Sequence, residues 1–176
     1  MFKMSDSIDS SKIKIVRLSS VYDLKRFDCG DADLNDFIQN DSLKYEGERL
    51  ASTFLVIYEE KLVAGFFSLV NDSIRLKDDE EDGLQKIIEY PATKIARLAV
   101  QKEIQRRGLG MLMIKIAIAL ILECKHGASR FVTVDSYPAA VRWYERFGFI
   151  RNRHSKYVRK DDFVSMRYDL LNPQKK

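Results

Sequence analysis

Residues 94–122 read KIARLAVQKEIQRRGLGMLMIKIAIALIL, and this stretch decides the fold. Residues 94–100 are a short apolar run that is typical of a buried strand. From Leu109 to Cys124, apolar side chains recur with the i, i+3, i+4, i+7 spacing of a helix that packs on a core. The stretch therefore predicts a strand, a short loop and a core helix in succession.

The loop between this strand and this helix has the composition of an anion-binding site. It contains Arg106, Arg107 and Gly108, and Gly110 follows in the first helical turn. A helix that begins here presents unpaired backbone N–H groups and the positive end of its dipole. A Cβ at either glycine would keep an anion away from those amides. We therefore predict a phosphate site, and the alternative is that Gly108 is simply a glycine at a helix start.

Length and composition favour one ordinary globular domain. The chain has 176 residues, of which 45% are hydrophobic and 32% are charged. We expect a flexible N-terminal lead over residues 1–12, one domain over 13–171 and a tail over 172–176. The apolar run 111–122 is too short to span a membrane, and residues 1–12 lack the apolar core of a signal peptide. We expect a cytoplasmic protein with no membrane partner.

The cysteine and histidine content argues against a metal site. Cys29 and Cys124 lie far apart, and only two histidines accompany them. No spacing typical of zinc ligands is present. We expect two buried or idle thiols and no bound metal.

Charge is distributed unevenly along the chain. Residues 1–90 carry 12 Lys+Arg and 19 Asp+Glu, whereas residues 91–176 carry 18 and 7. The acidic half contains the run 78–82, for which we expect a solvated loop. The basic half contains the run Arg151, Arg153, His154, Lys156, Arg159 and Lys160. Two interpretations of this basic face stay open: it binds a polyanionic partner, or it is a solvated surface with an uneven charge distribution.

The remaining segments complete an α+β pattern. Asp31 can cap a helix that ends at Gly47, and Pro138 can begin a second helix that ends at Gly148. Further strands are expected at 13–18, 52–58, 62–70, 130–134, 149–150 and 163–170, with a short helix at 84–88. The order predicts a mixed, mostly antiparallel sheet flanked by helices in a single domain.

Two motifs together resemble the GNAT acetyltransferase superfamily. The first is Gln105-x-x-Gly108-x-Gly110 between a strand and an apolar helix, and the second is the segment 140–149, which reads AVRWYERFGF. A lone glycine loop is weak evidence, but both motifs in this context are strong. The resemblance covers residues 13–170 and implies a single-domain GNAT fold that uses acetyl-CoA, or coenzyme A, as co-substrate.

The resemblance also implies roles for individual residues. Those expected at the pyrophosphate are Gln105, Arg106, Arg107, Gly108, Leu109, Gly110 and Met111. The backbone of Leu98, Ala99 and Val100 is expected to hold the pantetheine arm. Tyr144 is the expected general acid for the departing thiolate, and the alternative is a core aromatic. No general base stands out, with Glu89 and Asp135 as weak candidates.

A narrower resemblance points to the GNAT toxins that acetylate the α-amine of aminoacyl-tRNA. It rests on the pattern over residues 27–38, the glycine-containing strand 65–69 and Pro91-Ala92 ahead of the central strand. It implies charged tRNA as acceptor and a ribbon-helix-helix antitoxin as partner, and a homodimer stays open. Tyr137 stands where many GNATs have an Asn that contacts the cofactor. The alternatives are a GNAT acting on a small-molecule or protein amine, and a non-catalytic acyl-CoA-binding regulator.

Overall fold

The structure is a computed structural model, and it describes residues 7–80, 89–125, 127–157 and 162–173. Its strands are β1 (Ile13–Arg17), β2 (Ser52–Tyr58), β3 (Leu62–Ile74), β4 (Tyr90–Val100), β5 (Phe131–Ser136), β6 (Ile150–Arg151) and β7 (Val164–Asp169). Its α-helices are α1 (Ala32–Asp36), α2 (Ser42–Gly47), α3 (Leu109–Leu122) and α4 (Val141–Glu145). No helix in the described residues is long and apolar enough to cross a membrane.

The strands form one mixed sheet, as predicted. They are hydrogen-bonded in the order β1-β2-β3-β4-β5-β7-β6. β4 and β5 are parallel, whereas β1–β2, β2–β3, β5–β7 and β6–β7 are antiparallel. The expected strands 52–58 and 62–70 are thus present, and they pair with each other as an antiparallel hairpin. The chain forms two compact units, Met1–Val70 with Ala96–Ala117 and Asn71–Ile95 with Ile118–Lys176, which we call the first and the second unit.

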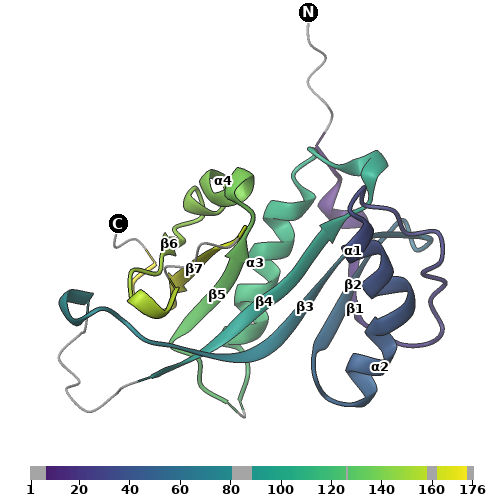
Figure 1. Ribbon diagram of the computed structural model, residues 1–176. Helices are drawn as coiled ribbons and strands as arrows, with labels where there is room; N and C mark the ends of the chain where they lie inside the picture. The colour runs from purple at the N-terminus through teal and green to yellow at the C-terminus, as the bar shows by residue number, and fades with distance from the viewer. Residues whose placement is uncertain (1–6, 81–88, 126, 158–161, 174–176) are drawn as a thin grey trace, which may run out of the picture. The chain divides into compact units, whose positions relative to one another are not determined.

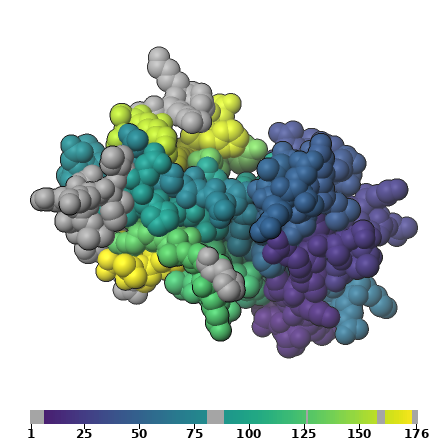
Figure 2. Space-filling model, turned by 90° about the horizontal axis from the view of Figure 1, so that it is seen from below, coloured from purple at the N-terminus to yellow at the C-terminus, as the bar shows by residue number. Residues whose placement is uncertain are grey.

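In the first unit, the helical segment 32–47 covers one face of β1 and β2 (Figures 1 and 2). Phe37 and Ile38 of this segment are buried in a core with Leu55, Phe66 and Ala99 of the strands. In Figure 2 the blue side chains of α1 and α2 lie against the purple N-terminal segment. This core fixes the end of β4, where the predicted cofactor residues begin.

The helical segment starts as predicted but is not one continuous α-helix. Asp31 caps α1, and its side chain accepts a hydrogen bond of 3.1 Å from the Leu34 N–H. A π-helical turn, Phe37–Asp41, separates α1 from α2. The Ser42 hydroxyl donates to the Ile38 carbonyl at 2.7 Å, a side-chain bond that competes with the helix ladder. The expectation of one helix from residue 31 to 47 is therefore wrong at its centre.

The start of α3 packs closely against β3 and β4 in the first unit. A Cβ added to Gly65 of β3 would lie 2.7 Å from the Ala99 carbonyl oxygen and 3.0 Å from the Met113 sulfur. Only glycine lets the β3 backbone lie this close to the Ala99 carbonyl of β4. The missing side chain of Gly65 also leaves room for the Met113 side chain of α3.

In the second unit, β5 is the central strand. Ala92, Thr93 and Lys94 of β4 are in register with Phe131, Val132 and Thr133 of β5. β5 also pairs along its whole length with β7. A small core of Ile74, Leu76, Tyr90, Ala92 and Phe131 packs against Tyr157. β4 begins four residues before the predicted strand because Tyr90 and Ala92 are buried in this core.

The predicted helix at residue 138 consists of a 3₁₀ turn, Pro138–Ala140, followed by α4. Gly148 has a φ of +89°, as expected for a glycine that ends a helix. The predicted helix 84–88 and residues Glu81, Asp82, His126, Arg159 and Lys160 lie outside the described residues.

Candidate functional site

The predicted anion loop lies in the first unit and leads directly into α3. A 3₁₀ turn, Lys102–Ile104, follows β4, and the first helical hydrogen bond runs from the Leu112 N–H to the Gly108 carbonyl at 3.2 Å. The N–H groups of Leu109, Gly110 and Met111 therefore belong to the first turn of a 14-residue helix and have no acceptor within it. This is the donor arrangement that binds phosphate groups.

Gly108 is required by its backbone conformation. Its φ is +87°, and nothing lies within 4 Å of the position that a Cβ would occupy. Arg106 also has a positive φ, of 62°. A side chain at Gly108 would thus be disfavoured by the left-handed backbone rather than by crowding.

Gln105 holds the loop in place in this structure. Its amide nitrogen donates to the carbonyl oxygens of Cys29 at 2.8 Å and Val100 at 2.9 Å. The Lys102 N–H donates in turn to the Asp28 carbonyl at 2.8 Å. A glutamine amide has two N–H donors, and here both are engaged. The expected contact of Gln105 with the cofactor stays a prediction, and its observed role is to tie the loop to Cys29 and Val100.

The three strand residues expected at the pantetheine arm lie next to this loop. β4 ends with Leu98, Ala99 and Val100. The last residue of β4 that pairs with β5 is Lys94, and β4 continues for six residues beyond it. Ala99 is buried, and the Val100 carbonyl accepts from Gln105. The guanidinium of Arg97 lies 3.7 Å from the centre of the Phe37 ring. The end of β4 is therefore held on both sides.

Tyr144 belongs to the second unit, whereas residues 98–100 and 105–111 belong to the first. Its ring lies 4.8 Å from that of Trp143 and 5.4 Å from that of Phe149. Burial raises the pKa of Tyr144 to about 12. The hydroxyl makes no hydrogen bond with any of the residues that the structure describes. The packing fits a core aromatic, and the protonated hydroxyl also fits a proton donor.

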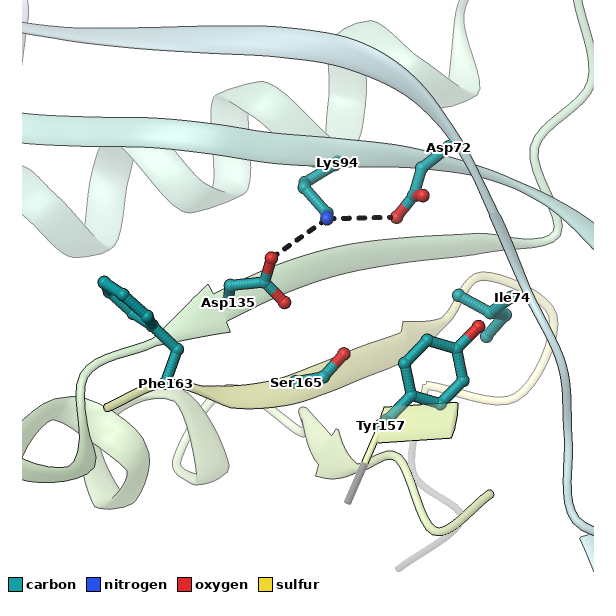
Figure 3. Close-up of a pocket in the computed structure, with 7 residues that line it drawn as sticks. All are labelled: Asp72, Ile74, Lys94, Asp135, Tyr157, Phe163 and Ser165. Atoms are coloured by element: carbon teal, nitrogen blue, oxygen red, sulfur yellow. Dashed lines mark hydrogen bonds and ion pairs between the residues drawn. The ribbon is translucent and has the colours of Figure 1, made fainter. Parts of the chain in front are cut away.

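The second unit contains a cavity of about 200 Å³ whose charged side chains come from three strands. Lys94 of β4 points between Asp72 of β3 and Asp135 of β5 (Figure 3). Its Nζ lies 3.0 Å from an Asp135 oxygen and 3.7 Å from an Asp72 oxygen. The Thr133 hydroxyl donates to the same Asp72 oxygen at 2.6 Å. Of these three residues the sequence singles out Asp135 alone as a candidate, because the three charges lie far apart in the chain.

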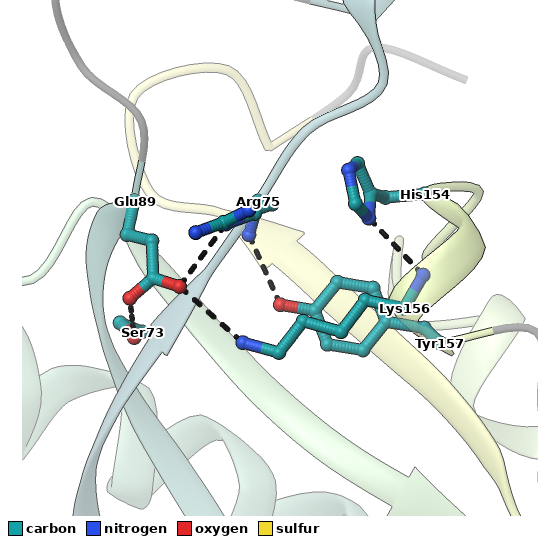
Figure 4. Close-up of polar contacts among 6 residues, drawn as sticks. All are labelled: Ser73, Arg75, Glu89, His154, Lys156 and Tyr157. Atoms are coloured by element: carbon teal, nitrogen blue, oxygen red, sulfur yellow. Dashed lines mark hydrogen bonds and ion pairs between the residues drawn. The ribbon is translucent and has the colours of Figure 1, made fainter.

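The other candidate base, Glu89, is occupied by donors. It accepts hydrogen bonds from Ser73 at 2.9 Å, Arg75 at 3.1 Å and Lys156 at 3.4 Å (Figure 4). The Ser73 hydroxyl and the neighbouring cations lower the pKa of this carboxyl. A carboxylate stabilised in this way is a poor proton acceptor. Glu89 therefore has a structural role, because it links β3, the start of β4 and the turn that contains Tyr157. The Tyr157 hydroxyl adds to this link by accepting a hydrogen bond of 3.0 Å from the Arg75 N–H.

Cations of the predicted basic face have acidic partners. Arg151 pairs with Glu145 at 3.4 Å and Arg153 with Asp79 at 2.8 Å. Glu80 pairs with Arg167 at 2.9 Å, and the side chains of these two residues are 11% and 5% exposed. The expectation of a solvated acidic loop is thus wrong for Glu80, because a buried guanidinium needs a charged partner.

Comparison with known proteins agrees with this geometry. The family model described as an acetyltransferase (GNAT) domain matches residues 22–170. Similar solved structures include AtaT complexed with acetyl-methionyl-tRNAfMet, which is 20% identical with a TM-score of 0.77 over 91% of this chain and 96% of that one. A Tyr-to-Phe mutant of KacT is 17% identical with a TM-score of 0.76 over 92% and 96%. A Tyr-to-Phe mutant of the AtaT toxin, bound to the C-terminus of the antitoxin AtaR and acetyl-CoA, is 18% identical with a TM-score of 0.72 over 92% and 95%. The predicted fold is confirmed.

Proposed function

The chain belongs to the GNAT acetyltransferase family, and we propose that it transfers the acetyl group of acetyl-CoA to a primary amine. The observation that carries this proposal is the loop between β4 and α3, with its left-handed Gly108 and the N–H groups of Leu109, Gly110 and Met111, which have no acceptor within the helix. These amides suit the pyrophosphate of coenzyme A. Arg106 and Arg107 add positive charge beside it.

The end of β4 is our candidate for the pantetheine arm. Leu98, Ala99 and Val100 would offer backbone N–H and C=O groups to the amides of the arm, in the manner of an added strand. A backbone N–H of this strand is also the natural donor to the oxyanion that forms on the acetyl carbonyl. Because the strand is fixed by the first-unit core, such a donor needs no reorganisation during the reaction.

Tyr144 is our candidate for the proton donor to the leaving thiolate. When the amine attacks the thioester carbonyl, a C–N bond forms, the C–S bond breaks, and the amine loses a proton while the thiolate gains one. With a pKa of about 12, the phenol is protonated at neutral pH. Transfer to a thiolate with a pKa near ~8.5 is unfavourable by about 5 kcal/mol unless the proton is replaced. We therefore expect Tyr144 to pass on a proton that the attacking amine releases.

Replacing Tyr144 by Phe tests this assignment. We expect kcat to fall by about 10²- to 10⁴-fold at saturating acceptor, with the Kd for acetyl-CoA unchanged. Tyr168→Phe is a matched control, because the Tyr168 ring packs against the same Phe149 at 5.4 Å. Equal turnover in the wild type and the Tyr144→Phe variant would show that this residue is only a core aromatic.

For the acceptor we propose the α-amine of an aminoacyl-tRNA, with the reaction in the cytoplasm. The similarity to AtaT, whose structure holds acetyl-methionyl-tRNAfMet, supports this proposal. An α-amine with a pKa of about 7.7–8.0 has a substantial neutral fraction near neutral pH and needs no strong base to release its proton, which agrees with the engaged state of Glu89. Thiol release from acetyl-CoA with charged tRNA, small amines and peptides would separate this acceptor from the alternatives. No release with any amine would favour a non-catalytic acyl-CoA-binding regulator.

An antitoxin and a second copy of the chain are the proposed protein partners. The similarity to AtaT bound by AtaR supports an antitoxin, for which we propose the ribbon-helix-helix type. A small gene of that type next to this one, whose product co-purifies with the chain, would support the assignment. Light scattering of the purified chain would test the homodimer.

A further inference from the structure

The cavity of the second unit is built to receive a positive charge. Its polar side holds two carboxylates, Asp72 and Asp135, and one ammonium, Lys94, so its net charge is negative. Asp72 is satisfied by Lys94 and Thr133. Asp135 receives Lys94 on one oxygen, and its second oxygen points away from Lys94 (Figure 3). A ligand cation can therefore pair with Asp135 without displacing the lysine.

The cavity lining also has hydrogen-bond donors that can bind a ligand. An ammonium has three N–H donors, and Lys94 donates one of them to Asp135 at 3.0 Å, while Asp72 lies 3.7 Å away as an ion-pair partner. Ser165 accepts a bond of 2.9 Å from Asn152 on its hydroxyl oxygen, so its own O–H can be donated elsewhere. A ligand that carries a carbonyl oxygen close to its amine would find donors for that oxygen here.

The rest of the lining is apolar and limits the ligand in size. Ile74, Tyr157 and Phe163 form this part of the wall, and Phe163 is 46% exposed. The volume of about 200 Å³ equals roughly seven waters at ~30 Å³ each. One amino-acid residue fits such a space. The aromatic rings also favour a cation over an anion.

We propose that this cavity binds an α-aminoacyl group through its amine, its carbonyl oxygen and an apolar side chain. Asp135 binds the amine, Lys94 and Ser165 donate to the carbonyl oxygen, and Phe163 with Tyr157 and Ile74 contacts the side chain. This assignment rests on the proposed function, because it gives the acceptor of that reaction a place in the second unit. It makes Asp135 and Phe163 the residues that select the acceptor.

Binding of leucinamide tests the proposal without any acetyl transfer. Leucinamide contains the amine, the carbonyl and an apolar side chain, N-acetyl-leucinamide lacks the amine, and glycinamide lacks the side chain. In NMR titrations of the full chain, we expect leucinamide to bind at least tenfold more tightly than either of the other two. Equal affinities for the three compounds would overturn the assignment.

Variants locate the site. Asp135→Asn and Phe163→Ala alter exposed side chains and should each weaken leucinamide binding at least tenfold. Asp33→Asn removes the same charge from an exposed position in α1 and should bind leucinamide like the wild type. Wild-type affinity in both cavity variants would refute the proposal.

Kinetics separate this proposal from the proposed function. If the wild type acetylates amines and Asp135→Asn leaves the KM for leucinamide unchanged, the cavity assignment is wrong while the acetyltransferase stands. If leucinamide binds at the cavity and no amine is ever acetylated, the cavity assignment stands while the activity is wrong. The Kd for acetyl-CoA should be the same in all these variants, because its proposed contacts lie in residues 98–111.

Discussion

Replacing Glu80 by Gln should lower the free energy of unfolding by about 3 kcal/mol. The Glu80 carboxylate lies 2.9 Å from the Arg167 guanidinium, and the two side chains are only 11% and 5% exposed. Removing one partner of a buried pair costs about 3–5 kcal/mol, because the other charge is left uncompensated. The glutamine keeps one oxygen acceptor, and Arg167 retains its bond of 3.0 Å to the Asn152 oxygen. The lower end of that range is therefore expected.

Urea unfolding followed by circular dichroism at neutral pH measures this change. Asp79→Asn is the matched control, because it removes the same charge one residue earlier. Asp79 pairs with Arg153 at 2.8 Å, but these side chains are 54% and 51% exposed. An exposed pair contributes at most about 1 kcal/mol and is screened by salt. We expect the small effect of Asp79→Asn to vanish at high salt and the effect of Glu80→Gln to persist.

The double variant Glu80→Leu with Arg167→Met tests the cause. If the uncompensated guanidinium is what destabilises Glu80→Gln, removing both charges should recover most of the lost stability. The reasoning fails if Glu80→Gln unfolds like Asp79→Asn. It also fails if the double variant is less stable than Glu80→Gln.

Three further changes probe the candidate site. Gly108→Ala places a side chain on a backbone with a φ of +87°, which costs about 1–2 kcal/mol. Calorimetry should therefore show acetyl-CoA bound about 5- to 30-fold more weakly, whereas the control Gly127→Ala should leave the affinity unchanged. Gln105→Ala removes the two hydrogen bonds to the carbonyls of residues 29 and 100, and urea unfolding should show a free energy of unfolding lower by about 1–2 kcal/mol. An unchanged free energy of unfolding would show that these two bonds are dispensable. Burial raises the pKa of Tyr144 from 10 to about 12, so its neutral form stabilises the fold below pH 10 and this contribution is lost as the pH rises to about 12. Unfolding of Tyr144→Phe should therefore depend less steeply on pH in that window, and equal slopes would contradict the burial.

The cofactor side of the fold could be predicted from sequence because its determinants are local. The strand, Gly108 and the first turn of α3 lie within a few residues of one another, and each follows a short-range rule. The same holds for the cap at Asp31, whose bond spans three residues. The π-helical turn was missed because a serine inside a helix only sometimes bonds back to the preceding turn.

The acceptor side could not be predicted in the same way. Lys94 lies 41 residues from Asp135 in the chain, and its cavity exists only because β3, β4 and β5 are neighbours in the sheet. The alternation of side chains along a strand predicts which face of the sheet a side chain lies on. It does not predict which residue of another strand lies beside it. A register for the parallel pair β4–β5 would have been needed to place the two residues together.

The ion pairs change the meaning of the uneven charge distribution. Counting charges suggests a basic second half that is free to attract a polyanion. Arg153 is instead shared between Asp79 and Glu80, and Arg167 is buried with Glu80. Exposed pairs are weak enough for a phosphate to replace the carboxylate, whereas a guanidinium that is 5% exposed cannot leave its partner without a large penalty. Among the residues that the structure describes, an RNA contact on this face would therefore fall to Arg153 and its exposed neighbours, and the acidic turn would compete with the RNA for them.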